Sequence, residues 1–106
     1  MSQILHVEDD PDWRRIMKYR LEQLGYEVVS CASLTEAREG FAQGEFVLVV
    51  CDGDIHGKGD GINWARELQS QGQKVIVVSG YPPEDMPSMN KNNIEGLGTL
   101  IQSVVQ

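Results

Sequence analysis

The stretch FVLVVCDGD, residues 46–54, decides the fold class of this chain. An unbroken apolar run over 46–51 predicts a strand that is buried on both faces, as is typical of the centre of a parallel sheet. The run stops at Asp52, and Asp54 follows one residue later. A buried strand that ends in carboxylates places them at the carboxyl edge of the sheet, where α/β sheets of this kind carry their functional groups.

On both sides of this strand, short apolar runs alternate with amphipathic runs. This alternation predicts parallel strands joined by helical crossovers. Further strands are expected at 4–7, 26–31 and 74–78, and helices after Asp10-Pro11, after the capping box 33–36 and around 62–68, with a last amphipathic stretch over 94–104. The face of the first helix expected to meet the core comprises Trp13, Ile16, Met17, Leu21 and Leu24.

Composition limits the class of protein. With 106 residues and 41% hydrophobic residues, the chain is expected to be a single domain spanning 1–106. A net charge of −7 argues against a general binder of nucleic acid or anionic membranes. The apolar runs are too short to span a bilayer, and residues 1–3 do not begin a secretory signal. Cys31 and Cys51 are read as buried thiols, so a cytoplasmic location is expected.

Acidic and hydroxyl residues follow the predicted strands. Glu8 and Asp9 follow the first strand, Asp52 the third and Ser79 the fourth. Carboxylates that converge there repel one another, and a divalent cation relieves this; Mg²⁺ suits carboxylate oxygens. An aspartate in such a site can attack a phosphoryl group, with Ser79 and Lys91 binding the phosphoryl oxygens. The alternative reading, that these residues only cap helices, fits Asp10 but not the whole set.

With these residues the chain resembles the receiver domain of response regulators in two-component signalling, over essentially its whole length. The resemblance implies a flavodoxin-like, doubly wound α/β fold with five parallel strands in the order 2-1-3-4-5. It implies that Asp52 is the phosphoacceptor, assisted by Ser79 and Lys91. It also implies Mg²⁺ held directly by Asp9, Asp52 and the backbone carbonyl of Asp54, with Glu8 acting through water.

The resemblance further implies a histidine kinase or a histidine phosphotransfer protein as phosphodonor, an output protein of unknown identity, and no turnover activity. Basic residues gather on the first helix and offer a docking patch for an acidic partner face; the other reading is an ordinary solvated helix face. These basic residues are Arg14, Arg15, Lys18 and Arg20.

The loop after Asp52 departs from the family pattern. His56 stands where the family usually has a proline. His56 is read either as a pH-sensitive lid or extra ligand, or as a solvated loop residue. The glycines of this loop are expected to make it unusually free; they are Gly53, Gly57, Gly59 and Gly61.

The segment between Ser79 and Lys91 is too short for a full crossover, and three of its residues are prolines. The fourth helix is therefore expected to be absent or a single turn, with a very short fifth strand at 88–90. Asn92 follows Lys91 where the family has a proline, so a trans bond is expected. Tyr81 is expected to gate the site or to cover the sheet edge.

Two alternative functions stay open. In the first, the chain is a pseudo-receiver, a module that binds partners without phosphorylation; the altered loops favour it. In the second, Asp52-Gly53-Asp54 belongs to a phosphatase of the haloacid dehalogenase type. That motif normally follows the first strand of a larger domain, whereas here it follows the third.

Overall fold

The computed structural model describes residues 2–55 and 59–105 of the chain. Strands and helices alternate along these residues, as the sequence pattern predicts. The elements in chain order are β1 (Gln3–Val7), α1 (Pro11–Gln23), β2 (Glu27–Cys31), α2 (Leu34–Gln43), β3 (Leu48–Asp52), α3 (Asp60–Ser70), β4 (Val75–Ser79), β5 (Ser88–Asn90), the 3₁₀ helix η2 (Lys91–Gly96) and α4 (Leu97–Val105). His56 lies outside the described residues, so the two readings of that histidine stay predictions.

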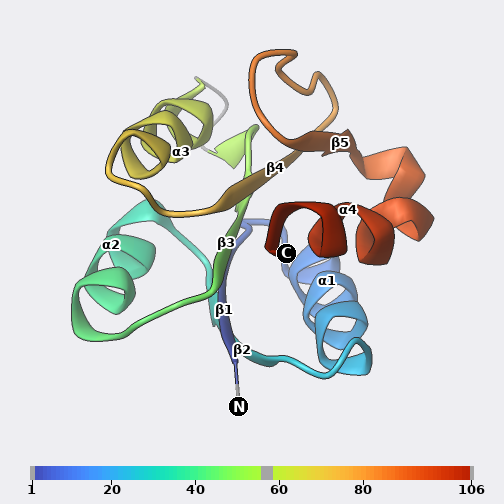
Figure 1. Ribbon diagram of the computed structural model, residues 1–106, viewed down its shortest axis with the longest axis horizontal. Helices are drawn as coiled ribbons and strands as arrows, with labels where there is room; N and C mark the ends of the chain where they lie inside the picture. The colour runs from blue at the N-terminus through green and yellow to red at the C-terminus, as the bar shows by residue number, and fades with distance from the viewer. Residues whose placement is uncertain (1, 56–58, 106) are drawn as a thin grey trace.

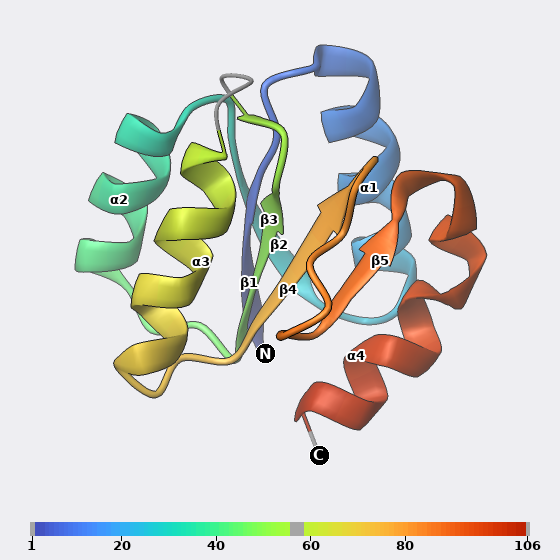
Figure 2. The same ribbon diagram turned by 90° about the horizontal axis from the view of Figure 1, so that it is seen from above.

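The strands form one parallel sheet in the order β2-β1-β3-β4-β5, which confirms the predicted doubly wound topology. Helices α2 and α3 cover one face of the sheet, and α1 and α4 cover the other (Figures 1 and 2). In this order the strands are added toward one edge up to β2 and toward the other edge from β3 on, so the carboxyl ends of β1 and β3 form the crevice in which such sheets bind ligands.

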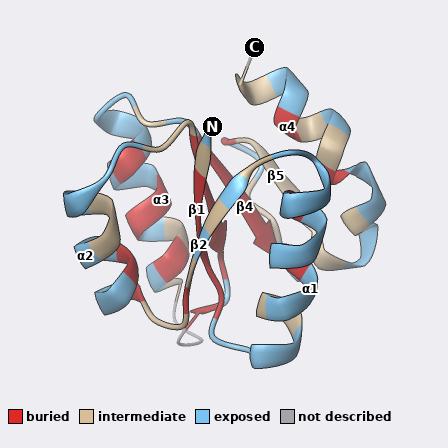
Figure 3. Ribbon diagram, turned by 90° about the horizontal axis from the view of Figure 1, so that it is seen from below, coloured by how far each residue is buried: buried red, intermediate tan, exposed pale blue. Residues whose placement is uncertain are grey.

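The core has two layers, one on each side of the sheet. Side chains alternate between the layers along each central strand: Leu5 and Val7 pack toward α2 and α3, and Ile4 packs toward α1 and α4. All five residues of β3 and of β4 are buried, as the continuous apolar runs predict, and the sheet forms the buried centre of Figure 3. None of the helices in the described ranges has the length and apolarity that a membrane crossing requires.

The residues predicted to begin and end the helices are found at the helix ends. The side chain of Asp10 accepts hydrogen bonds from the first-turn amides of α1, and Pro11 occupies the first helical position. Ser33 accepts from the amide of Glu36 at 3.2 Å, as in a capping box. Gly25 follows α1 with φ of +97°, a left-handed conformation in which glycine carries no steric penalty.

Two strands end later than predicted. β3 runs over Leu48–Asp52 and β4 over Val75–Ser79. Phe46, predicted to begin this strand, lies before β3, and its ring stacks on Phe41 of α2, with 6.4 Å between centroids. At the other end, Asp52 pairs with Val78, and Ser79 pairs with Asn90 of β5. Both polar residues are therefore fixed by the sheet itself, not by flexible loops.

The segment between β4 and β5, residues 80–87, contains bends and no helix, and β5 spans Ser88–Asn90. Both predictions for this segment are confirmed. Met86 is buried and packs into the core layer on the α2 and α3 side. Ser88 Oγ donates to the carbonyl of Pro83 at 2.7 Å. The peptide bond between Lys91 and Asn92 is trans, also as predicted.

Two expectations about individual side chains are wrong. Tyr81 neither gates the site nor covers the sheet edge, because 89% of its surface is exposed to solvent. Gly61 is not a source of freedom either: a Cβ there would overlap the backbone carbonyl of Asp52. Glycine is needed at position 61 so that the start of α3 can approach the end of β3.

Candidate functional site

Three carboxylates meet at the carboxyl edge of the sheet. Glu8 and Asp9 follow β1, and Asp52 is the last residue of β3. One side-chain oxygen from each lies within 4.8 Å of the others, so the predicted convergence is confirmed. Glu8 and Asp52 are almost fully buried, whereas Asp9 is exposed. The cluster thus has two buried carboxylates and one carboxylate that faces solvent.

Lys91 joins this cluster directly after β5. Its ammonium nitrogen lies 3.1 Å from Glu8 Oε1 and 3.3 Å from Asp52 Oδ1. The short segment before β5 therefore still delivers the predicted lysine to the site. The ring of Trp13, in the first turn of α1, covers the same ammonium group, with 5.8 Å from Nζ to the ring centroid. From the sequence, Trp13 was predicted to be a core or half-buried helix anchor; it is half-buried, but this contact was not predicted, and its position four residues after Asp9 was the available signal.

Burial and close charges shift the pKa values of Glu8 and Lys91. Burial, followed by the hydrogen bond and the negative charge of Asp52, raises the pKa of Glu8 to about 8. Burial acts to lower the pKa of Lys91, but the attraction of Asp52 and Glu8 outweighs it, so the pKa of Lys91 lies above its ordinary value. A shared proton and the lysine thus compensate the buried negative charge. Perturbed groups of this kind are typical of functional sites.

Ser79 reaches the site, but its hydroxyl is bonded to Asp54. Ser79 Oγ donates to Asp54 Oδ1 at 2.8 Å, and the amide of Gly80 donates to Asp54 Oδ2 at 2.8 Å. The amide of Asp54 in turn donates to Asp52 Oδ1 at 2.9 Å. The sequence drew attention to the backbone carbonyl of Asp54 and missed this role of its side chain, because an i to i+25 contact has no local signature.

The donor set fits a hard divalent cation. Carboxylate oxygens are the ligands that Mg²⁺ prefers, and Mg²⁺ retains several waters, which leaves positions for phosphoryl oxygens. Burial first, and then the hydrogen bond and negative charge of Asp52, raise the pKa of Glu8, and a cation beside the two carboxylates would favour the ionised form of Glu8. The three carboxylates that sequence reasoning selected therefore form a chemically suitable magnesium site.

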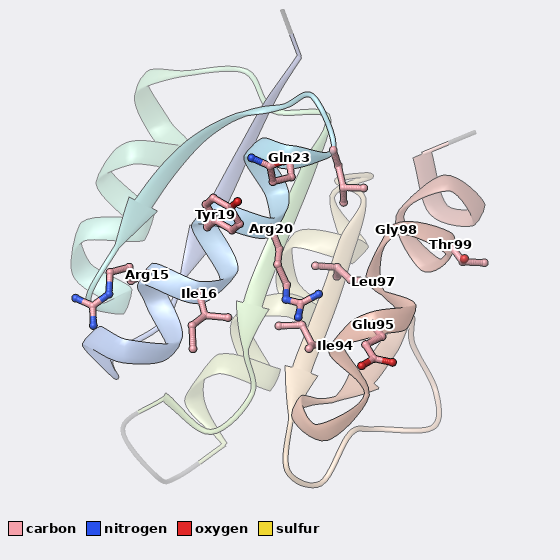
Figure 4. A pocket seen from close by; sticks show the side chains of 11 residues that line it. Arg15, Ile16, Tyr19, Arg20, Gln23, Ile94, Glu95, Leu97, Gly98 and Thr99 are labelled. Atoms are coloured by element: carbon pink, nitrogen blue, oxygen red, sulfur yellow. The ribbon is translucent and has the colours of Figure 1, made fainter.

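A groove lies between α1 and the η2–α4 segment (Figure 4). Ile16 and Leu24 line it, and they are 44% and 45% exposed. Both were predicted to face the core; only Met17 and Leu21 of that helical face are buried. The outer positions stay open because α4 packs against the sheet through Leu97 and Ile101 and does not close over α1. Arg15 and Arg20 also line the groove.

Comparisons with known proteins agree with this geometry. A family model described as the response regulator receiver domain matches residues 4–95. Among proteins of curated function, none is similar enough in sequence to count as a relative.

Solved structures with the same fold include a complex of the histidine kinase ThkA with the response regulator TrrA, whose matched chain is 25% identical, with a TM-score of 0.85 and full coverage of both chains. TrrA of Thermotoga maritima in complex with Mg(2+)-BeF is also 25% identical, with a TM-score of 0.83 over 98% of this chain and 99% of that one. A receiver domain protein of Clostridium thermocellum shares the fold at 22% identity, with a TM-score of 0.84 over 99% and 94% of the two chains.

Proposed function

Because the chain belongs to the response regulator receiver domain family, we propose that it accepts a phosphoryl group on Asp52 from a phosphohistidine. Receiver domains are signalling modules, and the proposed chemistry is one self-phosphorylation per molecule, without turnover. A carboxylate oxygen of Asp52 attacks phosphorus, and the new O–P bond forms as the N–P bond of phosphohistidine breaks, with its electron pair going to the ring nitrogen. The imidazole leaves as a neutral ring if its other nitrogen is already protonated; otherwise it takes a proton from water.

The observation that carries this proposal is the position of Lys91. Its ammonium group contacts both buried carboxylates, Glu8 at 3.1 Å and Asp52 at 3.3 Å. A cation at that place attracts the oxygens of an incoming phosphoryl group and stabilises the charge that develops during transfer. Ser79, at the end of β4, supplies a hydroxyl donor at the same edge of the sheet.

Asp9 and Asp52 are proposed to hold Mg²⁺ directly, together with the backbone carbonyl of Asp54, and Glu8 through water. When bound, the ion neutralises negative charge between the attacking carboxylate and the phosphoryl oxygens. The protein's own contribution is to fix the acceptor. Asp52 is held at the end of β3 by its pairing with Val78 and by the bond from the amide of Asp54.

The phosphodonor is proposed to be a histidine kinase or a histidine phosphotransfer protein, as the kinase complex of a structural neighbour supports. The groove beside α1 suits such a partner. Ile16 and Leu24 offer apolar surface, and Arg15 and Arg20 give its α1 side positive charge within an otherwise acidic protein. A helix with an apolar stripe and acidic flanks fits this surface.

The two cysteines are free and buried, as predicted, which supports a reducing, cytoplasmic compartment. The described elements share one sheet, which supports a single receiver domain over residues 1–106. The output partner stays unidentified, and neither nucleic acid nor membrane is proposed as a direct partner.

One observation favours the pseudo-receiver as a second candidate. Residues 80–87 form no helix, so the face that would carry such a helix is reduced. A module that binds partners without phosphorylation has no need for that helix to rearrange. In that case Asp52→Asn leaves partner binding unchanged.

The test is the intact mass of the protein after incubation with acetyl phosphate, with and without Mg²⁺. We expect a magnesium-dependent gain of one phosphoryl group in the wild type and no gain in Asp52→Asn. Asp10→Asn is the matched control, because asparagine caps a helix as well as aspartate does, and it is expected to gain the group normally. A folded wild type that stays unmodified in Mg²⁺ would favour the pseudo-receiver.

A further inference from the structure

The hydroxyl of Ser79 can donate one hydrogen bond, and it donates that bond to Asp54. A serine hydroxyl donates one hydrogen bond and accepts up to two. Here the donated bond goes to Asp54 Oδ1 at 2.8 Å, and one accepted bond comes from the amide of Tyr81 at 3.0 Å. Ser79 therefore has no donor left for a phosphoryl oxygen on Asp52 while the bond to Asp54 persists.

The same carboxylate also holds the chain that leaves β4. Asp54 Oδ2 accepts from the amide of Gly80 at 2.8 Å, so both oxygens of Asp54 bind consecutive residues. The carbonyl of Gly80 accepts from Asn90 Nδ2 at 3.3 Å, and Asn90 directly precedes Lys91. The Asp54 carboxylate thus connects Ser79, the start of the 80–87 segment and the strand that delivers the lysine.

On these grounds we propose that Asp54 is a positioning residue that withholds the Ser79 hydroxyl in the unphosphorylated protein. In the proposed function Ser79 donates to a phosphoryl oxygen on Asp52, so its hydroxyl must first leave Asp54. The bond from the Tyr81 amide to Ser79 and the bond from the Gly80 amide to Asp54 are then free to break. This inference rests on the proposed phosphorylation of Asp52 and adds its regulation.

Charge drives the exchange in the stated direction. A phosphoryl group carries about −1.5 to −2 charges near neutral pH and accepts hydrogen bonds strongly. The amide of Asp54 is already bonded to Asp52, so the new charge arises close to the Asp54 carboxylate and repels it. Release of Gly80 then moves Tyr81, whose side chain is 89% exposed and ready to contact a partner.

Asp54→Asn separates this role from simple packing. Asparagine keeps the shape and one acceptor for Gly80, but its amide donates to Ser79 Oγ and leaves the serine proton free. We expect phosphorylation by acetyl phosphate in saturating Mg²⁺ to be at least about tenfold faster than in the wild type, since a hydrogen bond to a charged acceptor no longer has to be broken. Asp54→Ala removes both acceptors and is expected to act in the same direction.

A double-mutant cycle with Ser79→Ala distinguishes this exchange from loss of charge alone. In the Ser79→Ala background there is no hydroxyl to release, so Asp54→Asn is expected to change the rate less than about twofold. Asp10→Asn removes one nearby charge without touching Ser79 and is expected to leave the wild-type rate within the same limit. The amide of Gly80 should exchange with solvent faster in phosphorylated wild type than in the unphosphorylated protein.

The outcomes are distinct. Acceleration that depends on Ser79, with loss of Gly80 protection on phosphorylation, supports the role of Asp54. If Asp54→Asn accelerates phosphorylation equally with and without Ser79, or in neither background, the role of Asp54 is overturned. The proposed function still stands in that case, because the wild type is phosphorylated. Failure of the wild type itself to become phosphorylated overturns both.

Discussion

The ammonium group of Lys91 lies 5.8 Å from the centroid of the Trp13 ring, so the first turn of α1 helps to place the lysine that follows β5. The lysine is followed by Asn92, not by the proline that the family usually has there. The ammonium group thus contacts the Trp13 ring as well as the two buried carboxylates, Glu8 and Asp52.

Replacing Trp13 tests this contact. A cation–π interaction contributes about 0.5–2 kcal/mol, so Trp13→Leu should slow phosphorylation by about 2- to 30-fold. Trp13→Phe keeps an aromatic face and should retain most of the rate. The measurement is the initial rate of phosphoryl gain from acetyl phosphate. Equal rates for the leucine and phenylalanine variants would mean that the aromatic face has no influence on Lys91.

Removing the lysine charge should destabilise the protein when Mg²⁺ is absent. Lys91→Met leaves Glu8 and Asp52 buried together without a cation. With the pKa of Glu8 raised to about 8 by burial, the loss of the lysine should matter most at alkaline pH, where the free energy of unfolding should fall by about 3 kcal/mol. Saturating Mg²⁺ should restore part of this loss because it supplies the missing positive charge. Urea unfolding with and without Mg²⁺ gives both values, and a variant as stable as the wild type without Mg²⁺ would contradict the prediction.

Magnesium affinity should depend on pH through Glu8. The pKa of Glu8 is raised to about 8, so below that pH the bound proton must leave before the cluster can receive a cation at full strength. Affinity should therefore increase with pH between about 6 and 8, by up to about tenfold per unit, and level off above. Calorimetric titration measures it. Glu8→Gln should flatten the profile, and an unchanged slope in that variant would assign the proton to another group.

His6 should make the fold sensitive to mild acid. It lies buried on β1, with Nδ1 3.1 Å from Ser30 Oγ. Burial, with the nearby charges of Arg14 and Lys91, lowers the pKa of His6 from 6.5 to about 4. Between these two pH values His6 binds a proton in the unfolded chain but not in the folded protein, so the free energy of unfolding decreases as pH falls from 6.5 to 4.

The contribution of His6 should be about 1.4 kcal/mol per pH unit, reaching about 3 kcal/mol near pH 4. Glu8 titrates with the opposite sign over part of this range, since its folded pKa is raised. The comparison is therefore between the wild type and His6→Gln, which share Glu8. Urea unfolding across this pH range should show the wild type losing stability relative to the variant as the pH falls. A constant difference would show that the pKa of His6 is the same in the folded and unfolded states, so that burial does not lower it.

Most of the fold was predictable because its signals are local. The caps at Asp10 and Ser33, the left-handed Gly25 and the buried runs of β3 and β4 depend on residues close together in the chain. The short segment before β5 followed from length and proline content alone. The convergence of Glu8, Asp9 and Asp52 followed from strand order.

The errors concern side chains whose environment is set by distant elements. Ile16 and Leu24 carry the helical period of core residues, yet they are exposed because α4 leaves a groove beside α1. Gly61 looked flexible, and its real constraint is the carbonyl of Asp52 in another element. The bond between Ser79 and Asp54 joins the end of β4 to the segment after β3 and has no sequence period.

The most direct test of the account is to locate the phosphoryl group after reaction with acetyl phosphate and Mg²⁺. Borohydride reduces an aspartyl phosphate to homoserine, which marks the modified residue in peptide mass spectra. The account predicts homoserine at position 52 and at neither Asp9 nor Asp54, with all reduction lost in Asp52→Asn. Homoserine at another position, or none in a folded protein that binds Mg²⁺, would contradict it.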